Sequence, residues 1–249
     1  MSYQTIQWRV EEPVGFLRLN RPGAGNKINE ALIEEAREAL AGCPAGVFII
    51  VLEGSPEVFC LGADFEGVGR EPVLPEPGAL YGLWEELALG PRVTIAHVRG
   101  RANAGGVGFV AACDIVIAEE AARFGLSELL FGLFPACVLP FLVRRVGFQK
   151  AHYLTLMTQS IDGLQAQAWG LADVCGPRSA DLLRRHLLRL RRLSPLGVSR
   201  YKRYAGALGG GLREAGPRAL RANQEVFSDA GNIEKIVRYV ESGRFPWED

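Results

Sequence analysis

The first half of the chain alternates short apolar runs of strand type with stretches of helical periodicity. Residues 14–20 alternate apolar and polar positions with a period of two and end at a Pro-Gly turn, which predicts a strand. Residues 47–52 are continuously apolar and rich in β-branched side chains, which is typical of a strand covered on both faces. Between them, Asn29 is suited to cap a helix to about Leu40 with one apolar stripe.

The same alternation continues to about residue 135, after which one helix follows another. Further strands are expected at residues 93–98, 114–118 and 122–125, and further helices at about residues 80–89 and 105–113. Residues 66–77, rich in Gly, Pro and Glu, are expected to form a mobile surface loop. We therefore predict an α/β protein with a core over residues 1–190 and a helical C-terminal region over residues 191–249.

Composition and charge exclude several classes of function. The 249 residues carry 28 Lys and Arg against 28 Asp and Glu, which argues against coating nucleic acid or adsorbing to a membrane. The longest uncharged apolar run is too short to span a bilayer, and the N-terminus lacks a signal-peptide pattern, so we expect a cytoplasmic protein. Five scattered Cys and three scattered His predict neither a disulfide framework nor a metal site.

Charge is nevertheless unevenly distributed. Residues 178–203 contain nine Lys or Arg and a single acidic residue, Asp181. Such a run is commonly a solvated helix face. It is also what a docking surface for an anionic partner requires, such as a carrier protein or a phosphate-bearing cofactor. The sequence leaves both interpretations open.

Two glycine-containing segments, residues 59–65 and 103–109, follow predicted strands and can present backbone N–H groups to a ligand. The second segment opens a helix, whose first N–H groups are unpaired and lie at the positive end of the helix dipole. Its spacing does not match a dinucleotide fingerprint, and the Gly-Lys-Ser/Thr of a phosphate-binding P-loop is absent. An oxyanion site is the favoured interpretation, and close helix-to-sheet packing is the alternative.

Four motifs in register resemble the crotonase (enoyl-CoA hydratase/isomerase) superfamily. They are Glu57-Val-Phe-Cys-Leu-Gly-Ala-Asp64, Ala104-Gly-Gly-Val-Gly108 before Ala112-Cys-Asp-Ile115, Phe124-Gly-Leu-Ser-Glu128 and Gly132-Leu-Phe-Pro135. The resemblance implies a spiral of ββα units with C-terminal helices that mediate trimers or dimers of trimers. It also implies an acyl-thioester substrate whose carbonyl oxygen is held by the backbone N–H groups of Ala63 and Gly105. Two preorganised donors of this kind stabilise the enolate formed when a proton leaves the carbon next to the thioester.

One position departs from the pattern of that superfamily. Hydratases usually carry two glutamates, one on the helix after the oxyanion glycine and one in the Phe-Gly-x-x-Glu segment. Here Gly108 occupies the first position and Glu128 the second. Glu128 lies in an otherwise apolar stretch, which should raise its pKa and suit it to act as a base and then as an acid. A surface or structural role for Glu128 is the alternative.

A finer resemblance is to the dehydratases of polyketide β-branching, carried by residues 57–65, 130–143 and 147–153. It implies conversion of a carrier-protein-bound 3-hydroxy-3-methylglutaryl group to 3-methylglutaconyl, with Glu128 removing the C2 proton. The leaving hydroxyl would be protonated by Glu128 or by Asp64, although Asp64 could instead only brace its loop. No cofactor is expected beyond the phosphopantetheine of an acyl carrier protein, or CoA, that carries the substrate.

Candidates for the substrate pocket are Tyr81, Trp84, His97 and Cys137. Tyr81 and Trp84 lie in the helix that lines the acyl channel in the superfamily, whereas a lone strand histidine such as His97 is commonly a packed core residue. Three other functions stay open: the companion decarboxylase, a hydratase or isomerase of free CoA thioesters, and a non-catalytic carrier-binding subunit. Arg70, the only basic residue between Phe65 and Pro91, gives the decarboxylase little cationic support.

Overall fold

The computed structural model describes residues 3–65, 76–208 and 211–248. Most of the loop predicted over residues 66–77, including Arg70, lies outside the described residues. The strands are β1 (Ile6–Glu11), β2 (Val14–Leu19), β3 (Ile49–Glu53), β4 (Val58–Cys60), β5 (Val93–Val98), β6 (Arg101–Asn103), β7 (Ile115–Glu119), β8 (Arg123–Gly125), β9 (Ile161–Asp162) and β10 (Val174–Gly176). The helices are α1 (Glu30–Ala41), α2 (Pro77–Leu89), α3 (Gly105–Ala112), α4 (Leu139–Val146), α5 (Phe148–Met157), α6 (Gly163–Ala168), α7 (Ser179–Leu190), α8 (Pro195–Leu208), α9 (Leu212–Phe227) and α10 (Ala230–Ser242), with single 3-10 turns η1 (Pro22–Ala24) and η2 (Glu128–Phe131).

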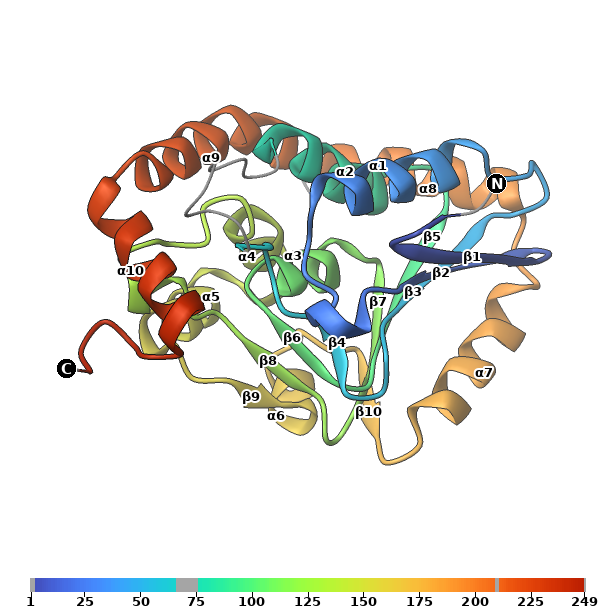
Figure 1. Ribbon diagram of the computed structural model, residues 1–249. Coiled ribbons are helices and arrows are strands. Elements are labelled where there is room, and N and C mark those ends of the chain that lie inside the picture. The colour runs from blue at the N-terminus through green and yellow to red at the C-terminus, as the bar shows by residue number, and fades with distance from the viewer. Residues whose placement is uncertain (1–2, 66–75, 209–210, 249) are drawn as a thin grey trace.

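The fold repeats a unit of two strands and a helix (Figure 1). In the three units that begin at β3, β5 and β7, the first strand joins a six-stranded sheet of order β1-β2-β3-β5-β7-β10, and the second joins a four-stranded sheet of order β4-β6-β8-β9. The strands β2, β3, β5, β7 and β10 are parallel to one another, and β1 pairs antiparallel with β2 at the edge. This arrangement confirms the predicted α/β spiral of ββα units.

The strands and helices predicted in the first half of the chain are confirmed to within a few residues. Asn29 caps α1, and its side chain accepts a hydrogen bond from the N–H of Leu32 at 3.0 Å. The pattern missed β1, whose outward-facing residues are mostly exposed, and the very short strands β4, β6, β9 and β10. Strands of two or three residues are too short to show a period of two.

Apolar clusters cover both faces of the large sheet, as expected for its continuously apolar strands. One cluster joins alternate residues of β3 and β5 to α1, α2 and α3, and the other joins the intervening residues to α7 and α8. The glycine segments lie on the first of these two sides, because α3 begins at Gly105.

The C-terminal helices cover the core of their own chain. Helix α8 contacts α2, α9 contacts α2 and α4, and α10 contacts η2. Lys202 of α8 is buried, and its Nζ donates to Arg92 O and Asp114 Oδ2 at 2.7 Å each. The predicted boundary coincides with the end of α7 at Leu190, and the division into two domains stays a prediction. No helix in the described ranges is long and apolar enough to cross a membrane.

Candidate active site

The two glycine segments meet because β4 and β6, which precede them, are paired parallel neighbours. Gly62 has φ +95°, and a Cβ at this position would lie 2.8 Å from Ala104 Cβ and 3.5 Å from Gly105 N. Conversely, a Cβ at Gly105 would lie 3.7 Å from Gly62 Cα. Residues separated by more than forty positions in the chain therefore pack so closely that Gly62 has no room for a side chain.

The backbone around this contact leaves two N–H groups free. Ile28 donates to Gly62 O at 2.8 Å and accepts from the N–H of Asp64 at 2.9 Å, so this short bridge engages the neighbours of Ala63 but not its own N–H. Gly105 is the first residue of α3, whose N–H has no acceptor within the helix. Within the described residues, neither N–H donates a hydrogen bond. Two free donors on touching loops form a suitable site for an oxyanion.

Ala104 turns the chain into α3 through an unusual backbone conformation. Its φ is +49° and its ψ is −121°, a combination that costs a non-glycine residue roughly 1–3 kcal/mol. The conformation is held from both sides, since the N–H of Ala104 donates to Gly125 O at 3.0 Å and β6 pairs with β8. The sheet thus fixes the direction of the Gly105 N–H before any substrate arrives.

Glu128 reaches the same region because β8 lies beside β6, with Asn103 opposite Gly125. The side chain of Asn103 donates to Ser127 Oγ at 2.9 Å, which fixes the turn that begins at Glu128. The Oε2 atom of Glu128 is buried and has no hydrogen-bond partner in the described part of the chain. Burial raises the pKa of this carboxyl to about 7, and hydrogen bonds from nearby backbone N–H groups oppose the shift in part.

A carboxyl group whose pKa is raised to about 7, placed just after the strand that pairs with β6, is suited to transfer a proton next to a carbonyl held by the two free backbone donors. A family model described as enoyl-CoA hydratase/isomerase matches residues 9–249. The chain belongs to the enoyl-CoA hydratase/isomerase family.

Individual members of the family show the same likeness. The chain is 52% identical to the bacillaene synthase dehydratase PksH of Bacillus subtilis, over 100% of this chain and 98% of that protein. A crystal structure of PksH from Bacillus subtilis superimposes with a TM-score of 0.95 at 51% identity, covering 98% of this chain and 100% of that one. The 2,3-dehydroadipyl-CoA hydratase of Escherichia coli is 32% identical over 89% of this chain and 83% of its own length.

Packing explains why position 108 is a glycine in this chain, where hydratases of the family usually carry the first of two glutamates. A Cβ at Gly108 would lie only 2.5 Å from Cζ2 of Trp84, so the indole occupies the space of any larger side chain. The ring is fixed edge-on against Phe109 and Phe141, with centroids 5.8 Å away in each case. Position 108 therefore cannot take a glutamate unless Trp84 moves, which leaves Glu128 as the candidate for the base.

Asp64 lies beside Ala63, but its carboxylate is engaged. Asp64 Oδ2 forms an ion pair with Arg21 at 2.8 Å, and both side chains are mostly buried. Arg21 also donates to Lys27 O at 2.5 Å, which ties the Asp64 loop to the segment before α1. These contacts favour the bracing role for Asp64 over direct proton transfer.

Tyr81 and Cys137 are buried farther along the interface with α9. The Tyr81 hydroxyl donates to Leu212 O at 2.6 Å, and the Cys137 thiol lies 3.9 Å from Ala219 O. Burial raises the pKa of the Cys137 thiol to about 11, so it stays protonated and unreactive at neutral pH. In the structure these two residues hold α9 in place, and their predicted role in the substrate pocket stays untested.

His97 is separated from the other candidates because neighbouring residues of a strand point to opposite faces. Ala96 and Val98 face the side of α3, whereas His97 shares the face of Ile95 that α7 covers. Its Nε2 lies 3.0 Å from Ser179 Oγ and its Nδ1 lies 3.4 Å from Glu53 Oε2. The sheet therefore stands between His97 and the glycine loops, and the packed-core alternative fits its position.

Sequence patterns gave no sign of the residues that support Glu128 from a distance. Asn232 of α10 donates to Gly132 O at 3.2 Å, and Gly132 has φ +81° at the end of η2. The pairing of Asn103 with Ser127 and that of Arg21 with Asp64 also join segments far apart in sequence. No local motif could have revealed such contacts.

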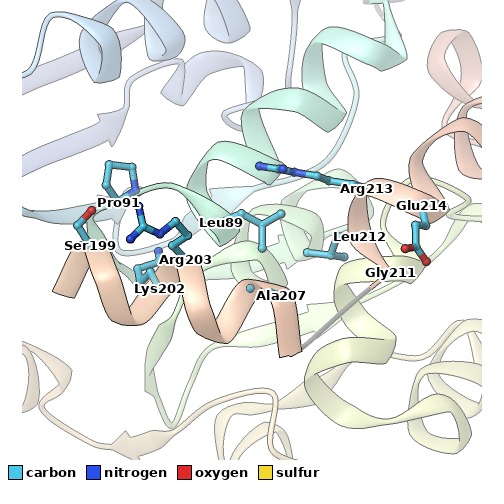
Figure 2. Close-up of a pocket in the computed structure, with 11 residues that line it drawn as sticks. Leu89, Pro91, Ser199, Lys202, Arg203, Ala207, Gly211, Leu212, Arg213 and Glu214 are labelled. Atoms are coloured by element: carbon cyan, nitrogen blue, oxygen red, sulfur yellow. The ribbon is translucent and has the colours of Figure 1, made fainter. Parts of the chain in front are cut away.

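A hollow lies elsewhere, between the end of α2 and helices α8 and α9, as Figure 2 shows. It has a volume of about 540 Å³, and Lys202, Arg203, Arg213 and Glu214 contribute to its wall. The Lys202 ammonium is already hydrogen-bonded to Asp114 and to backbone carbonyls. This hollow contains none of the residues around the glycine loops.

The raised pKa of Glu128 predicts the pH dependence of the reaction. The base must be ionised, so we expect kcat/KM to fall tenfold per pH unit below about pH 7 and to level off above it. A pH–rate profile between pH 5 and 9 measures this directly, with the carrier-bound substrate well below KM. A plateau that extends unchanged to pH 5 would contradict a base with a pKa of about 7, because such a base would be about 99% protonated at pH 5.

Proposed function

We propose that this protein is a dehydratase that converts a carrier-protein-bound 3-hydroxy-3-methylglutaryl thioester to the 3-methylglutaconyl thioester. The observation that carries the proposal is the combination of one buried carboxyl with a pKa of about 7 and two free N–H donors on touching loops. One carboxyl that can both accept and return a proton is sufficient for a syn elimination of water.

The proposed reaction balances with groups of this chain alone. The thioester oxygen accepts hydrogen bonds from the N–H groups of Ala63 and Gly105. The Glu128 carboxylate takes the C2 proton, and the electron pair of that C–H bond forms the enolate. The C2–C3 double bond then forms as the C3–O bond breaks, and neutral Glu128 returns its proton so that water leaves. No redox step or metal ion is needed, so the only prosthetic element is the phosphopantetheine arm of the substrate.

The relatives support the choice of reaction and of pathway class. The protein with 52% identity over the full chain is named a dehydratase of bacillaene synthase, a polyketide system. Hydration of a free CoA thioester, the activity named for the Escherichia coli relative, is disfavoured here because Trp84 excludes a glutamate at position 108.

The proposal is tested by intact-mass spectrometry of a carrier protein loaded with 3-hydroxy-3-methylglutaryl-phosphopantetheine. The expected result is the loss of one water from the loaded carrier on incubation with the enzyme. Loss of carbon dioxide from the pre-dehydrated carrier, without dehydration, would instead identify a decarboxylase. Turnover of the CoA thioester alone would assign a free-CoA hydratase, and no turnover of either would leave only a binding role.

An acyl carrier protein is the proposed partner, and its docking surface is proposed to include the basic run of residues 178–203. Lys202 does not belong to this surface because it is buried. Arg178 and Arg184 each lie within ion-pair distance of Asp181, whereas the charged side chains of α7 are otherwise turned to solvent. A docking surface of this kind predicts that KM for the loaded carrier rises with salt, whereas KM for a pantetheine thioester does not.

We also propose that the protein works in the cytoplasm as a homotrimer or a dimer of trimers. Large apolar side chains are exposed on α5, among them Phe148 at 66% and Leu156 at 58%. Exposed apolar groups of this size on one helix are suited to contact another copy. Light scattering coupled to size-exclusion chromatography measures the assembly, and a monomeric mass at micromolar concentration would contradict the proposal.

A further inference from the structure

The indole of Trp84 takes the place that a side chain at position 108 would occupy. A Cβ at Gly108 would lie 2.5 Å from Cζ2, 2.6 Å from Cη2 and 2.9 Å from Cε2 of the ring. A Cβ at Gly105, the residue with the free N–H, would lie 3.8 Å from the same Cζ2 atom. The benzene edge of the indole therefore lies along the first turn of α3, directly beside the oxyanion site.

The indole of Trp84 also carries one polar atom, Nε1. Nε1 is bonded to Cε2, the ring atom 2.9 Å from a Cβ at residue 108, so the indole N–H lies close to the space that a side chain at residue 108 would occupy. Trp84 is 1% exposed, and its Nε1 is buried without a hydrogen-bond partner in the described part of the chain. An indole N–H only donates, and leaving a buried donor unpaired costs about 1–3 kcal/mol.

The unpaired buried side-chain atoms of the described residues are few. They are Trp84 Nε1, Glu128 Oε2 and Arg99 Nε. Arg99 already donates through another nitrogen to Gly54 O at 3.0 Å, so its guanidinium is partly satisfied. The remaining two atoms are the donor Trp84 Nε1, beside Gly105, and the acceptor Glu128 Oε2, which belongs to the proposed base. Unpaired polar groups of this kind are expected where a ligand supplies the missing partners.

Distance along α3 indicates which part of the substrate the indole meets. Gly108 lies three residues after Gly105, so the two positions are neighbours on one face of the helix, about 5–6 Å apart. In a 3-hydroxyacyl thioester, three carbon atoms separate the carbonyl oxygen from the C3 oxygen, a span comparable to one helical turn. With the carbonyl oxygen at the Gly105 N–H, the C3 oxygen comes beside the indole.

We propose that the Trp84 Nε1–H donates a hydrogen bond to the C3 hydroxyl oxygen of the substrate and stabilises the negative charge that develops there as the C3–O bond breaks. The inference rests on the proposed dehydratase function. The proton that completes the departing water comes from Glu128, and Trp84 keeps its own proton. A neutral donor thus stands where other members of the family carry a second carboxylate, and it lowers the barrier to breaking the C3–O bond because it stabilises the charge on the leaving oxygen.

The experiment separates C–O cleavage from proton removal. Two carrier-bound substrates are used: the 3-hydroxy-3-methylglutaryl thioester, and the 3-methylglutaryl thioester, which lacks the C3 hydroxyl. Dehydration of the first is followed by the loss of water, and exchange of the C2 proton of the second by the uptake of deuterium from D₂O. Exchange needs Glu128 and the two backbone donors but no leaving oxygen, so it reports a structural disturbance of the site.

Trp84→Phe removes the N–H and keeps most of the ring, and 3-benzothienylalanine at position 84 replaces the N–H by sulfur with almost no change in shape. Trp169→Phe is the control. We expect both changes at position 84 to lower kcat for dehydration about tenfold or more, with KM and C2 exchange within about twofold of the wild type. The control should leave all three quantities unchanged.

Other outcomes would overturn the inference. A parallel loss of dehydration and exchange in both variants would show that Trp84 only shapes the site. Unchanged dehydration in the benzothienyl variant would show that the N–H is not used. Exchange without any dehydration by the wild type would overturn the proposed function, and this inference with it.

Discussion

Replacing Glu128 by Gln is expected to abolish dehydration, with a loss of roughly 10²–10⁴-fold in kcat, as for removal of a general base. The amide keeps the size of the side chain and its backbone hydrogen bonds but accepts no proton from C2. The measurement is the rate of water loss from the loaded carrier protein, together with C2 exchange of the substrate without a hydroxyl. Both are expected to disappear, in contrast to the selective effect expected at Trp84.

Glu120→Gln is the matched control, because it removes the same negative charge at a residue that is exposed in the turn after β7. This control should keep the wild-type rate. If Glu128→Gln retained more than about a tenth of the wild-type kcat, Glu128 would not be the base, since a general base contributes at least about 10²-fold.

The same substitution carries a second expectation, on stability. Burial raises the folded-state pKa of Glu128 to about 7, so the folded protein holds this proton where the unfolded chain has lost it. The contribution to stability is full below about pH 4.5 and is lost as the pH rises to about 7, by on the order of 1–3 kcal/mol. Glu128→Gln removes this loss, so its Tm should exceed that of the wild type at pH 8 and approach it at pH 5. Thermal unfolding at the two pH values measures the difference.

Gly106→Ala is expected to have the second large effect, because it forces the two glycine loops apart. A Cβ at Gly106 would lie 2.1 Å from Cys60 O, a backbone atom that cannot rotate away. Cys60 precedes the loop of Ala63, and Gly106 follows Gly105, so relief of the clash separates the two oxyanion donors. We expect kcat to fall about 10²–10³-fold and stability to fall by about 1–3 kcal/mol.

Gly82→Ala provides the comparison. Gly82 lies inside α2, and a Cβ there would meet nothing within 4 Å. Alanine at such a helical position should be neutral or stabilising by roughly 0.5–1 kcal/mol, with unchanged activity. Denaturant unfolding and steady-state kinetics of both variants check the pair, and a Gly106→Ala enzyme with wild-type kcat would refute the oxyanion assignment.

Local order in the chain was sufficient to place the longer buried strands and the helices of the first half, and to indicate the candidate chemistry. Periodicity placed the buried strands and the helix that Asn29 caps, because burial of alternate residues leaves its mark within a few positions. The motifs around Gly105 and Glu128 indicated a helix N-terminus for an anion and a carboxyl in apolar surroundings, which need only neighbouring residues. The spiral of ββα units was implied by the resemblance of the four motifs to the crotonase superfamily.

Tertiary structure determined which residues come together in the site. The pairing of β4 with β6 and of β6 with β8 brings Gly62, Gly105 and Glu128 together, and no sequence pattern specifies the pairing of three-residue strands. The face of β5 on which His97 lies, and the ion pair that engages Asp64, likewise depend on distant partners.

The contact between Trp84 and Gly108 shows the division most clearly. The sequence showed that position 108 lacks a carboxylate and that an earlier helix carries Trp84. It did not show that the indole of Trp84 fills the space of a side chain at position 108. A local pattern records which side chains are apolar or charged. Contacts between residues twenty or more positions apart depend on how the elements pack, and packing is determined by the whole fold rather than by any segment.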